Sequence, residues 1–165
     1  MNTDRIEKKI LLRASRERVW RAISDSAEFG TWFGIRFQSQ FEPGKRMEGV
    51  LVPTQVIPEV GESQKNYEGM KFEFTVERIE PQRLFSFRWH PNAVDDGTDY
   101  SQESTTLVEF ILEDSPGGIE LTIVESGFDA IPLARRAQAF RSNDCGWSEM
   151  IRVIEAYVSQ NARHA

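Results

Sequence analysis

The sequence predicts an α+β fold in which an antiparallel sheet of about six or seven strands wraps round one long C-terminal helix. Three observations lead to this prediction. Several short segments alternate apolar and polar side chains, which is typical of half-buried strands. Clusters of Pro, Gly, Asp and Ser separate these segments and predict tight turns. From about Pro132 to Gln160 the apolar residues recur in steps of four and three, which predicts a long amphipathic helix.

Length and composition favour one cytoplasmic domain. The chain has 165 residues, and no repeat or shift in composition divides it, so we expect a single domain over 1–165. Cys145 is the only cysteine and cannot form an intramolecular disulfide. The N-terminus lacks the apolar segment of a secretion signal. No apolar run approaches the roughly 20 residues that a membrane-spanning helix needs, so we expect no membrane span.

The charge argues against a nucleic-acid partner. The net charge is −6 and the sequence pI is about 5.1, whereas binding to phosphate backbones depends on clustered Lys and Arg. His90 and His164 stand far apart, so no His and Cys cluster has the spacing of metal ligands. We therefore expect neither a metal nor another cofactor.

The N-terminal residues predict a strand followed by a short helix. Arg5 to Ala14 alternates loosely and is expected to be the first strand. Ser15 then provides a good N-cap, and Val19, Trp20 and Ile23 fall on one face of the helix that follows.

A second short helix and a hairpin come next. Ser24-Asp25-Ser26 offers capping side chains, and Gly30 or Gly34 is expected to end the helix. Ile35 to Phe41 alternates again, and Glu42-Pro43-Gly44-Lys45 predicts a turn. Two short helices are therefore expected after the first strand.

The middle of the chain predicts two strands separated by a loop. Met47 to Val56 is expected to be the second strand of the hairpin. Pro58 and Gly61 interrupt the pattern that follows, so residues 57–69 are predicted to form a loop. Met70 to Ile79 alternates regularly and predicts a half-buried strand.

Three further strands complete the expected sheet. Leu84 to His90 carries its aromatic residues on one face, and the polar stretch Pro91 to Glu103 follows. Thr105 to Glu113 and Ile119 to Glu125 are expected to be strands joined by the turn Asp114 to Gly118, which makes a second hairpin.

The last third predicts a helix of about 40 Å at a rise of 1.5 Å per residue. This length allows it to cross the whole sheet. Gly146 weakens it locally and permits a bend. The apolar row that maps one face of the helix is Leu133, Ala137, Phe140, Asp144, Trp147, Ile151, Ile154 and Val158.

Short motifs follow one another in a specific order along nearly the whole chain. They are Arg18 to Asp25, Trp32-Phe33-Gly34, Phe41 to Gly44, Ile79 to Leu84 with Trp89, Glu125 to Phe128, and Gly146-Trp147 leading to Tyr157. Their order resembles that of the START-like superfamily, also called birch-pollen-allergen-like or SRPBCC. Within it, the chain resembles the family related to the C-terminal domain of the activator of heat-shock-protein-90 ATPase. The longer segment between Val50 and Tyr67 departs from many such domains.

The resemblance implies a helix-grip fold with a cavity between the sheet and the C-terminal helix. Ligand pockets are mostly apolar with a few polar groups, and this chain supplies many candidates for such a wall. The alternative is that the same side chains fill a solid core. The candidate ligand-binding residues are Trp32, Phe33, Phe72, Phe74, Phe85, Phe87, Trp89, Phe110, Leu121, Ile123, Phe128, Phe140, Trp147, Met150, Ile151 and Ile154.

Two carboxylates are the candidate catalytic residues. Asp144 stands in the apolar row of the C-terminal helix, and Glu125 has the inward parity of its strand. Two inward carboxylates could form an acid/base pair or hold a ligand hydroxyl or amine. Alternatively, Asp144 lies where the helix starts or bends, and Glu125 pairs with an Arg at the rim. His90 and Arg88 point outward by parity, and Cys145 has no partner that would activate it as a nucleophile.

Three functions fit these observations. We favour binding of a hydrophobic or aromatic small molecule without catalysis, because the aromatic residues are many and the acid/base groups few. The resemblance also allows an enzyme of the cyclase, aromatase or dehydratase kind that uses the inward carboxylates. A third alternative is a chaperone-cofactor-like interaction module with a protein partner, and a homodimer is a further possibility. That module would need an exposed apolar patch rather than an interior cavity.

Overall fold

The computed structural model describes residues 4–94 and 97–162. Its strands form one antiparallel seven-stranded sheet in the order β1-β7-β6-β5-β4-β3-β2. This confirms the predicted α+β helix-grip fold. The strands are β1 (Arg5–Leu12), β2 (Ile35–Phe37), β3 (Arg46–Leu51), β4 (Lys71–Glu80), β5 (Leu84–Trp89), β6 (Thr106–Ser115) and β7 (Gly118–Ser126). The α-helices are α1 (Arg16–Ser24), α2 (Ser26–Phe33), α3 (Pro58–Gln64) and α4 (Leu133–Ala162), and the 3-10 helices are η1 (Lys65–Tyr67) and η2 (Phe128–Ala130).

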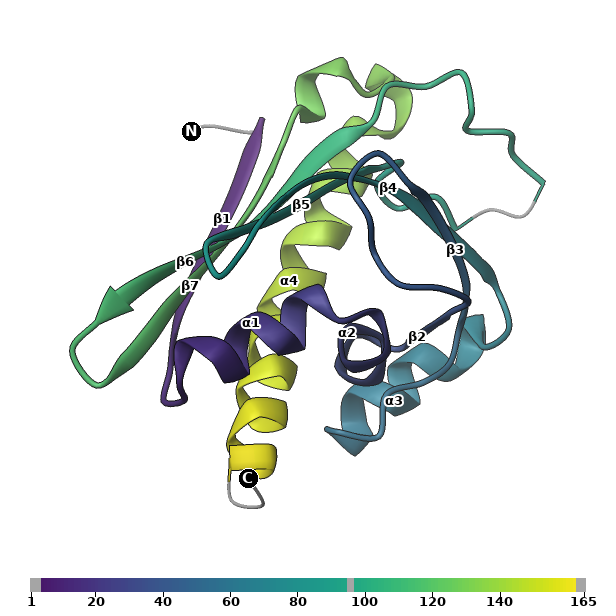
Figure 1. The fold of residues 1–165 in the computed structure, drawn as a ribbon. Helices are drawn as coiled ribbons and strands as arrows, with labels where there is room; N and C mark the ends of the chain where they lie inside the picture. Colours follow the sequence, from purple (N-terminus) through teal and green to yellow (C-terminus); the bar gives the residue numbers. More distant parts are fainter. Residues whose placement is uncertain (1–3, 95–96, 163–165) are drawn as a thin grey trace.

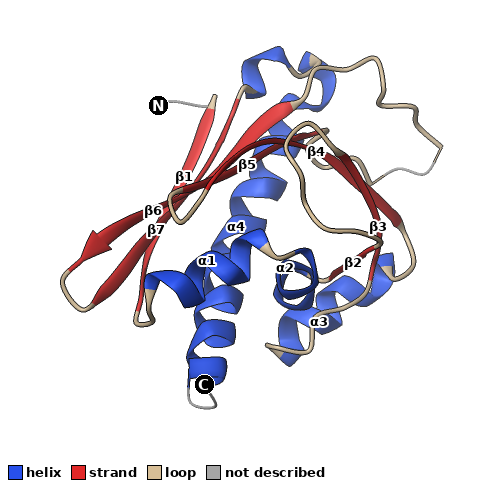
Figure 2. Cartoon of the chain, in the orientation of Figure 1, coloured by secondary structure: helices blue, strands red, loops and turns tan. Residues whose placement is uncertain are grey.

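The sheet curves over α4, which runs across the strands (Figure 1). Helices α1 and α2 lie on the same side of the sheet, and α4 contacts both of them and β1. Figure 2 shows that α3 lies at the β2 edge of the sheet, beside α2 and β2. The concave side of the sheet therefore faces three helices, and the core lies between them and the strands.

The capping residues set the limits of the helix pair. The Ser15 side chain accepts a hydrogen bond from the backbone N–H of Arg18, and Asp25 caps α2 in the same way. Gly34 ends α2 with a φ of 100°, a left-handed conformation that glycine adopts without strain. Gly30 has a different role, because a Cβ there would lie 2.0 Å from a backbone carbonyl oxygen. Of the two glycines considered, Gly34 is therefore the one that ends the helix.

The prediction of a loop over residues 57–69 is wrong, because this segment forms α3 and η1. Pro58 stands at the first turn of α3, where a missing N–H costs nothing. At the other end of the helix, Gln64 ties the segment to the domain. Its side chain accepts from the N–H of Thr54 at 2.8 Å and donates to the carbonyl of Phe33 at 3.0 Å. The proline interpreted as an interruption therefore marks a helix start.

The predicted C-terminal helix is confirmed as α4, but its buried face begins later than the apolar row indicated. Leu133 is 79% exposed, and Ala137 is also exposed. The first turns thus extend past the core. None of the described helices is long and apolar enough to span a membrane. The buried face consists of Ala139, Trp147, Met150, Val153, Ile154, Tyr157 and Val158.

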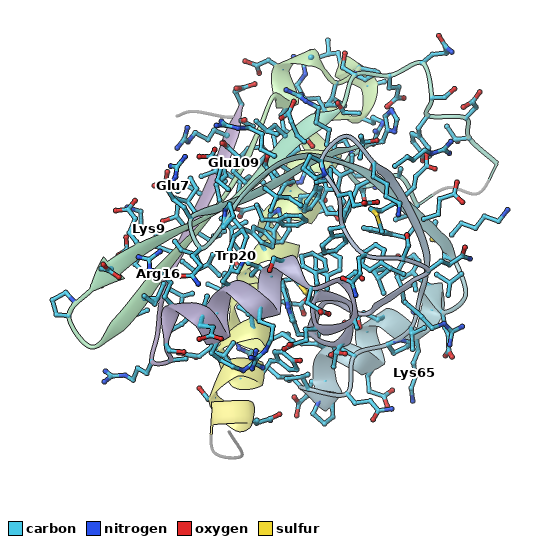
Figure 3. The ribbon with its side chains drawn as sticks, in the orientation of Figure 1. Glu7, Lys9, Arg16, Trp20, Lys65 and Glu109 are labelled. Carbon is cyan, nitrogen blue, oxygen red and sulfur yellow. The ribbon has the colours of Figure 1, made fainter. Side chains whose placement is uncertain are left out.

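Aromatic rings fill much of the space between α2 and the sheet. Phe29 of α2 is fully buried, and its ring stacks on that of Phe110 with the centroids 5.8 Å apart. Phe74 and Phe87 stack at 4.0 Å on neighbouring strands. Such ring pairs contribute about 0.5–1.5 kcal/mol beyond the burial of their area. Figure 3 shows that side chains occupy the region between the sheet and the helices.

Candidate functional site

Glu125, near the end of β7, is completely buried and is the acceptor for four side chains. The indole Nε1 of Trp89 donates to its Oε2 at 2.8 Å, and the hydroxyl of Thr106 donates to the same oxygen at 2.6 Å. The indole Nε1 of Trp147 donates to Oε1 at 2.8 Å. The amide Nδ2 of Asn143 lies 2.9 and 3.0 Å from the two oxygens. The predicted inward position of Glu125 is therefore confirmed.

Four elements bring these groups together. Trp89 ends β5 and pairs in register with Thr106, which begins β6. Glu125 lies on the next strand, where β6 and β7 are paired. Asn143 and Trp147 are four residues apart on α4, so they share one face of that helix. The sheet thus supplies the carboxylate and two donors, and α4 supplies the other two.

No cation compensates the carboxylate of Glu125 among the donors that the described residues provide. Two indoles, a hydroxyl and an amide are all neutral, whereas the sequence favoured an arginine at the rim as the alternative. Burial of a charge is costly unless hydrogen bonds or an opposite charge offset it. Hydrogen bonds alone do so here. A buried carboxylate held only by neutral donors departs from the usual pairing of buried charges, and such departures concentrate at functional sites.

The two indoles and two phenylalanine rings form a set of four aromatic rings. Trp89 and Trp147 stack with their ring centroids 5.8 Å apart. The ring centroid of Phe33, at the end of α2, lies 6.3 Å from that of Trp89 and 6.0 Å from that of Trp147. The ring centroid of Phe72, on β4, lies 5.9 Å from that of Phe33 and 5.8 Å from that of Trp89. Phe33, Phe72 and Trp89 are only half-buried, so this set, which we name the four-ring cluster, has edges open to solvent.

The remaining candidate wall residues fall into three groups. Phe128 and Phe140 form a separate ring pair at 5.1 Å near the start of α4. Ile151 is half-buried against the core, and Met150 is buried on α4. The other candidates are buried members of the hydrophobic core, and they are Trp32, Phe74, Phe85, Phe87, Phe110, Leu121, Ile123 and Ile154.

The prediction that Asp144 faces the interior is wrong. Its side chain is 46% exposed and forms an ion pair with Lys8 of β1 at 2.9 Å. Its neighbour Asn143 makes the inward contact with Glu125 instead. The apolar row predicted for the C-terminal helix was therefore displaced by one residue here, because the inward position is 143 and not 144. The two carboxylates do not share an environment, and an acid/base pair made of Asp144 and Glu125 loses one of its members.

Sequence reasoning missed Thr106 and Asn143, although one of them carried a signal. Thr106 has the same parity as Phe110 on its strand, so counting back in twos places it inward. No comparable pattern indicated Asn143, because it is not a member of the apolar row predicted for the C-terminal helix. An amide that supports a buried carboxylate becomes visible only once the helix register is known.

The other residues considered as nucleophiles or bases lie outside this site. Arg88 is exposed, and its Nε donates to Glu77 at 2.9 Å. The His90 ring lies 3.1 Å from the backbone carbonyl of Glu103, and Cys145 is exposed. Over residues 4–94 and 97–162, no three His, Cys, Asp or Glu side chains gather as metal ligands would.

The hollows at the surface of the described residues include two of different size. The larger holds about 370 Å³, and it is lined by Arg13, Ile57, Arg152, Glu155, Ala156 and Ser159. The smaller holds about 60 Å³ and lies against the sheet, where it is lined by Arg46, Glu73, Phe74, Thr75, Arg88, Trp89, His90 and Thr105. Trp89 therefore borders the smaller hollow and the four-ring cluster together.

A second polar cluster lies around Glu28 of α2. Arg18 Nη1 donates to Glu28 Oε1 at 2.8 Å, and Arg21 Nε donates to Oε2 at 2.8 Å. The hydroxyl of Tyr157 donates to Oε1 at 2.9 Å, and the Arg18 guanidinium lies 5.0 Å from the Tyr157 ring centroid. Burial, and then the hydrogen bond to Glu28, raise the pKa of Tyr157. We name these residues the Glu28 cluster.

Arg135 connects the start of α4 to the segment before β6. Its Nε donates to the Glu103 carboxylate at 2.8 Å, and its Nη1 donates to the carbonyl of Pro91 at 2.8 Å. The guanidinium also lies 4.8 Å from the ring centroid of Tyr100. This arginine is thus engaged by a carboxylate other than Glu125.

The fold and the order of its motifs agree with a known family. The family model of the "Activator of Hsp90 ATPase homolog 1-like protein" matches residues 13–159, which is most of the chain. The chain belongs to this family. A search of curated proteins found no match.

Solved structures share the fold at low sequence identity. A protein from Arthrobacter aurescens has a TM-score of 0.73 and 16% identity, over 97% of this chain and 90% of that one. A protein from Mesorhizobium loti has a TM-score of 0.68 and 17% identity, over 94% of this chain and 97% of that one. The Aha1 dimer from Colwellia psychrerythraea has a TM-score of 0.64 and 14% identity, over 93% and 95%. These similarities establish the fold alone.

Proposed function

We propose that the chain binds an aromatic small molecule, without catalysis, at the four-ring cluster between the sheet and α4. One observation carries the proposal. Rings from α2, β4, β5 and α4 converge, and two of them donate hydrogen bonds to one buried carboxylate. An apolar wall with a single fixed polar group is the usual composition of a small-molecule site.

The half-buried rings are the surface that a ligand would contact first. Phe33, Phe72 and Trp89 each keep part of the ring exposed. A ligand ring that stacks on them gains about 0.5–1.5 kcal/mol for each favourable ring pair beyond the burial of its area. The buried rings behind them, such as Phe74 and Phe87, form a second layer. We propose that Phe33 and Phe72 move outward to admit the ligand, because neither is fully enclosed.

The surroundings of Glu125 favour binding over catalysis. Its oxygens already accept hydrogen bonds from four protein groups, so a reacting proton would have to displace one of them. Asp144 is paired with Lys8 at the surface and offers no second carboxylate. A cyclase-like or dehydratase-like mechanism would need such a second acid/base group near the ligand.

The exposed apolar side chains do not favour the chaperone-cofactor alternative. Val52, Tyr67, Val94 and Leu133 are the large apolar residues most exposed in the described part of the chain. They come from four separate segments of the chain, and a docking surface would have to bring them together in one contiguous patch. The Colwellia relative is described as a dimer, and a homodimer stays a prediction for this chain.

An NMR titration that follows the four indole N–H signals tests the proposal. Pooled flavonoids, polyketide-like aromatics, sterols and fatty acids serve as ligands. We expect an aromatic pool to shift the Trp89 and Trp147 signals saturably. Trp20 of α1, labelled in Figure 3, is half-buried outside the cluster and serves as the internal reference.

A matched pair of variants locates the binding site. Phe72→Leu removes a ring of the cluster, and we expect it to weaken aromatic binding about fivefold to tenfold, the value of one ring contact. Phe140→Leu removes a half-buried ring on α4 that pairs with Phe128 outside the cluster, and we expect it to retain binding. Equal losses in the two variants, or no saturable shift from any pool, would contradict the proposal.

A further inference from the structure

The two indoles of the four-ring cluster share an electrostatic feature that bears on the ligand class. Both Trp89 and Trp147 donate their N–H groups to Glu125, each at 2.8 Å. An indole N–H can only donate, so these contacts complement a carboxylate. Hydrogen bonds of this kind polarise the donor, and the negative charge lies directly behind the edges of both rings.

Aromatic faces attract cations because the ring quadrupole is negative above and below the ring plane. Trp is the best of the aromatic residues in this role, and the interaction strengthens when the site excludes water. The carboxylate of Glu125 adds a full negative charge in the same direction. Trp147 is buried and Trp89 is half-buried, so water screens this charge poorly.

Basic side chains on the elements that build the site are paired with other carboxylates, and Arg88, beside Trp89, pairs with Glu77 at 2.9 Å. The Lys8 ammonium pairs with Asp144 at 2.9 Å, and the Arg135 guanidinium pairs with Glu103 at 2.7 Å. The four side chains that donate to Glu125 carry no charge. The site therefore offers four aromatic rings and a carboxylate whose charge its own donors leave uncompensated.

We infer that the four-ring cluster selects an organic cation, a quaternary or protonated amine on an aromatic body, over a neutral or anionic molecule of the same shape. The inference rests on the proposed function, since it names the ligand class of that same site. The cationic group would lie against the half-buried rings of Phe72, Phe33 and Trp89. The aromatic body would stack against the remaining rings.

Three probes of similar shape test the inference. They are benzyltrimethylammonium, its neutral carbon isostere neopentylbenzene, and the anion 3-phenylpropionate, each titrated below its solubility limit while the indole signals are followed. We expect the cation to bind at least about tenfold more tightly than the neutral isostere, because a desolvated cation–π contact exceeds the roughly 1.4 kcal/mol that a factor of ten represents. We expect the anion to bind most weakly.

The outcomes separate the inference from the proposed function. Neutral binding as tight as that of the cation overturns the cation selectivity and leaves aromatic binding intact. If aromatic pools shift Trp89 and Trp147 but the cation does not, the selectivity is again overturned. If nothing shifts these two signals, both proposals fail.

Two variants extend the test. Glu125→Gln keeps the side-chain size but removes the charge, and we expect the preference for the cation to fall below about threefold while the neutral isostere still binds. If Glu125→Gln does not fold, Phe72→Leu remains informative, because it removes a π face and keeps an apolar side chain. We expect Phe72→Leu to reduce the preference and Phe140→Leu to retain it. A preference that both Glu125→Gln and Phe72→Leu leave unchanged would overturn the inference.

Discussion

Two carboxylates on the concave side of the sheet are stabilised in opposite ways. Glu28 accepts hydrogen bonds from Arg18, Arg21 and Tyr157, so two cations offset its charge. Glu125 is more deeply buried, yet it accepts only from neutral groups. The Glu28 cluster has the composition of an ion-pair network that joins helices, and it needs no ligand to complete it. Glu125 is the carboxylate that a cationic ligand would complement.

The largest expected effect comes from removal of the Glu125 carboxylate. Glu125→Ala leaves four donors without an acceptor, of which those of Thr106 and Trp147 are buried, and each unpaired buried group costs about 1–3 kcal/mol. We expect the free energy of unfolding to fall by at least about 4 kcal/mol, as measured by urea denaturation. A loss below about 1 kcal/mol would mean that water or other groups satisfy these donors.

An exchange of charge between two neighbouring residues tests the register of α4. Asn143→Asp would place a second carboxylate against Glu125, and we expect a loss of about 3 kcal/mol. Asp144→Asn removes only a surface ion pair with Lys8, and we expect a loss below about 1 kcal/mol. Thermal unfolding of the two variants measures both effects. Equal losses would contradict the placement of Asn143 toward the interior.

The Glu28 cluster contains its own matched comparison. Arg18 is 6% exposed, and Arg18→Ala removes a buried partner of Glu28, so we expect a loss of about 2 kcal/mol. Arg21 is exposed, and we expect Arg21→Ala to cost less than about 1 kcal/mol. Urea denaturation of the two variants measures the difference. If Arg21→Ala proves the more costly, the assignment of Arg18 as the main partner fails.

The smallest effect is a pH dependence that arises from Tyr157. Its pKa is raised, first by burial and then by the hydrogen bond to Glu28, so the folded state holds the phenolic proton more tightly than the unfolded chain does. The stabilisation is present below the unfolded pKa of about 10 and is lost as the pH rises through the higher folded pKa. We expect the stability difference between the wild type and Tyr157→Phe to shrink from pH 8.5 to about pH 11. A difference that is constant over this range would contradict the raised pKa.

Periodicity predicted the fold well, because each main element carries its own pattern. The alternation in β4 and β5 and the apolar steps in α4 follow from which faces are buried, and capping residues such as Ser15 identified a helix start. α3 was missed because Pro58 is compatible with both a break and a first helical turn. The hydrogen bond from the Gln64 side chain to the Phe33 carbonyl, which holds this segment against the domain, joins residues distant in the sequence.

The candidate site was predictable only in part. Strand parity was sufficient for Glu125, because a period of two leaves little freedom at the end of a paired strand. Helical periodicity was insufficient for Asp144, because adjacent helical positions differ by about 100°. The periodicity of a long helix does not determine which residues of that helix face the sheet at each point along it. Which residue of α4 reaches Glu125 depends on tertiary packing. The sequence alone therefore could not predict that the donors to Glu125 are all uncharged, which is the observation behind the inferred ligand class.

The location of a bound cation tests the central claim most directly. Nuclear Overhauser effects between the methyl groups of benzyltrimethylammonium and the protein, measured at saturation, identify the residues that surround the cation. We predict cross-peaks to the ring protons of Phe33, Phe72 and Trp89. Cross-peaks confined to Ile57 and Ala156, which line the larger surface hollow, would contradict the account.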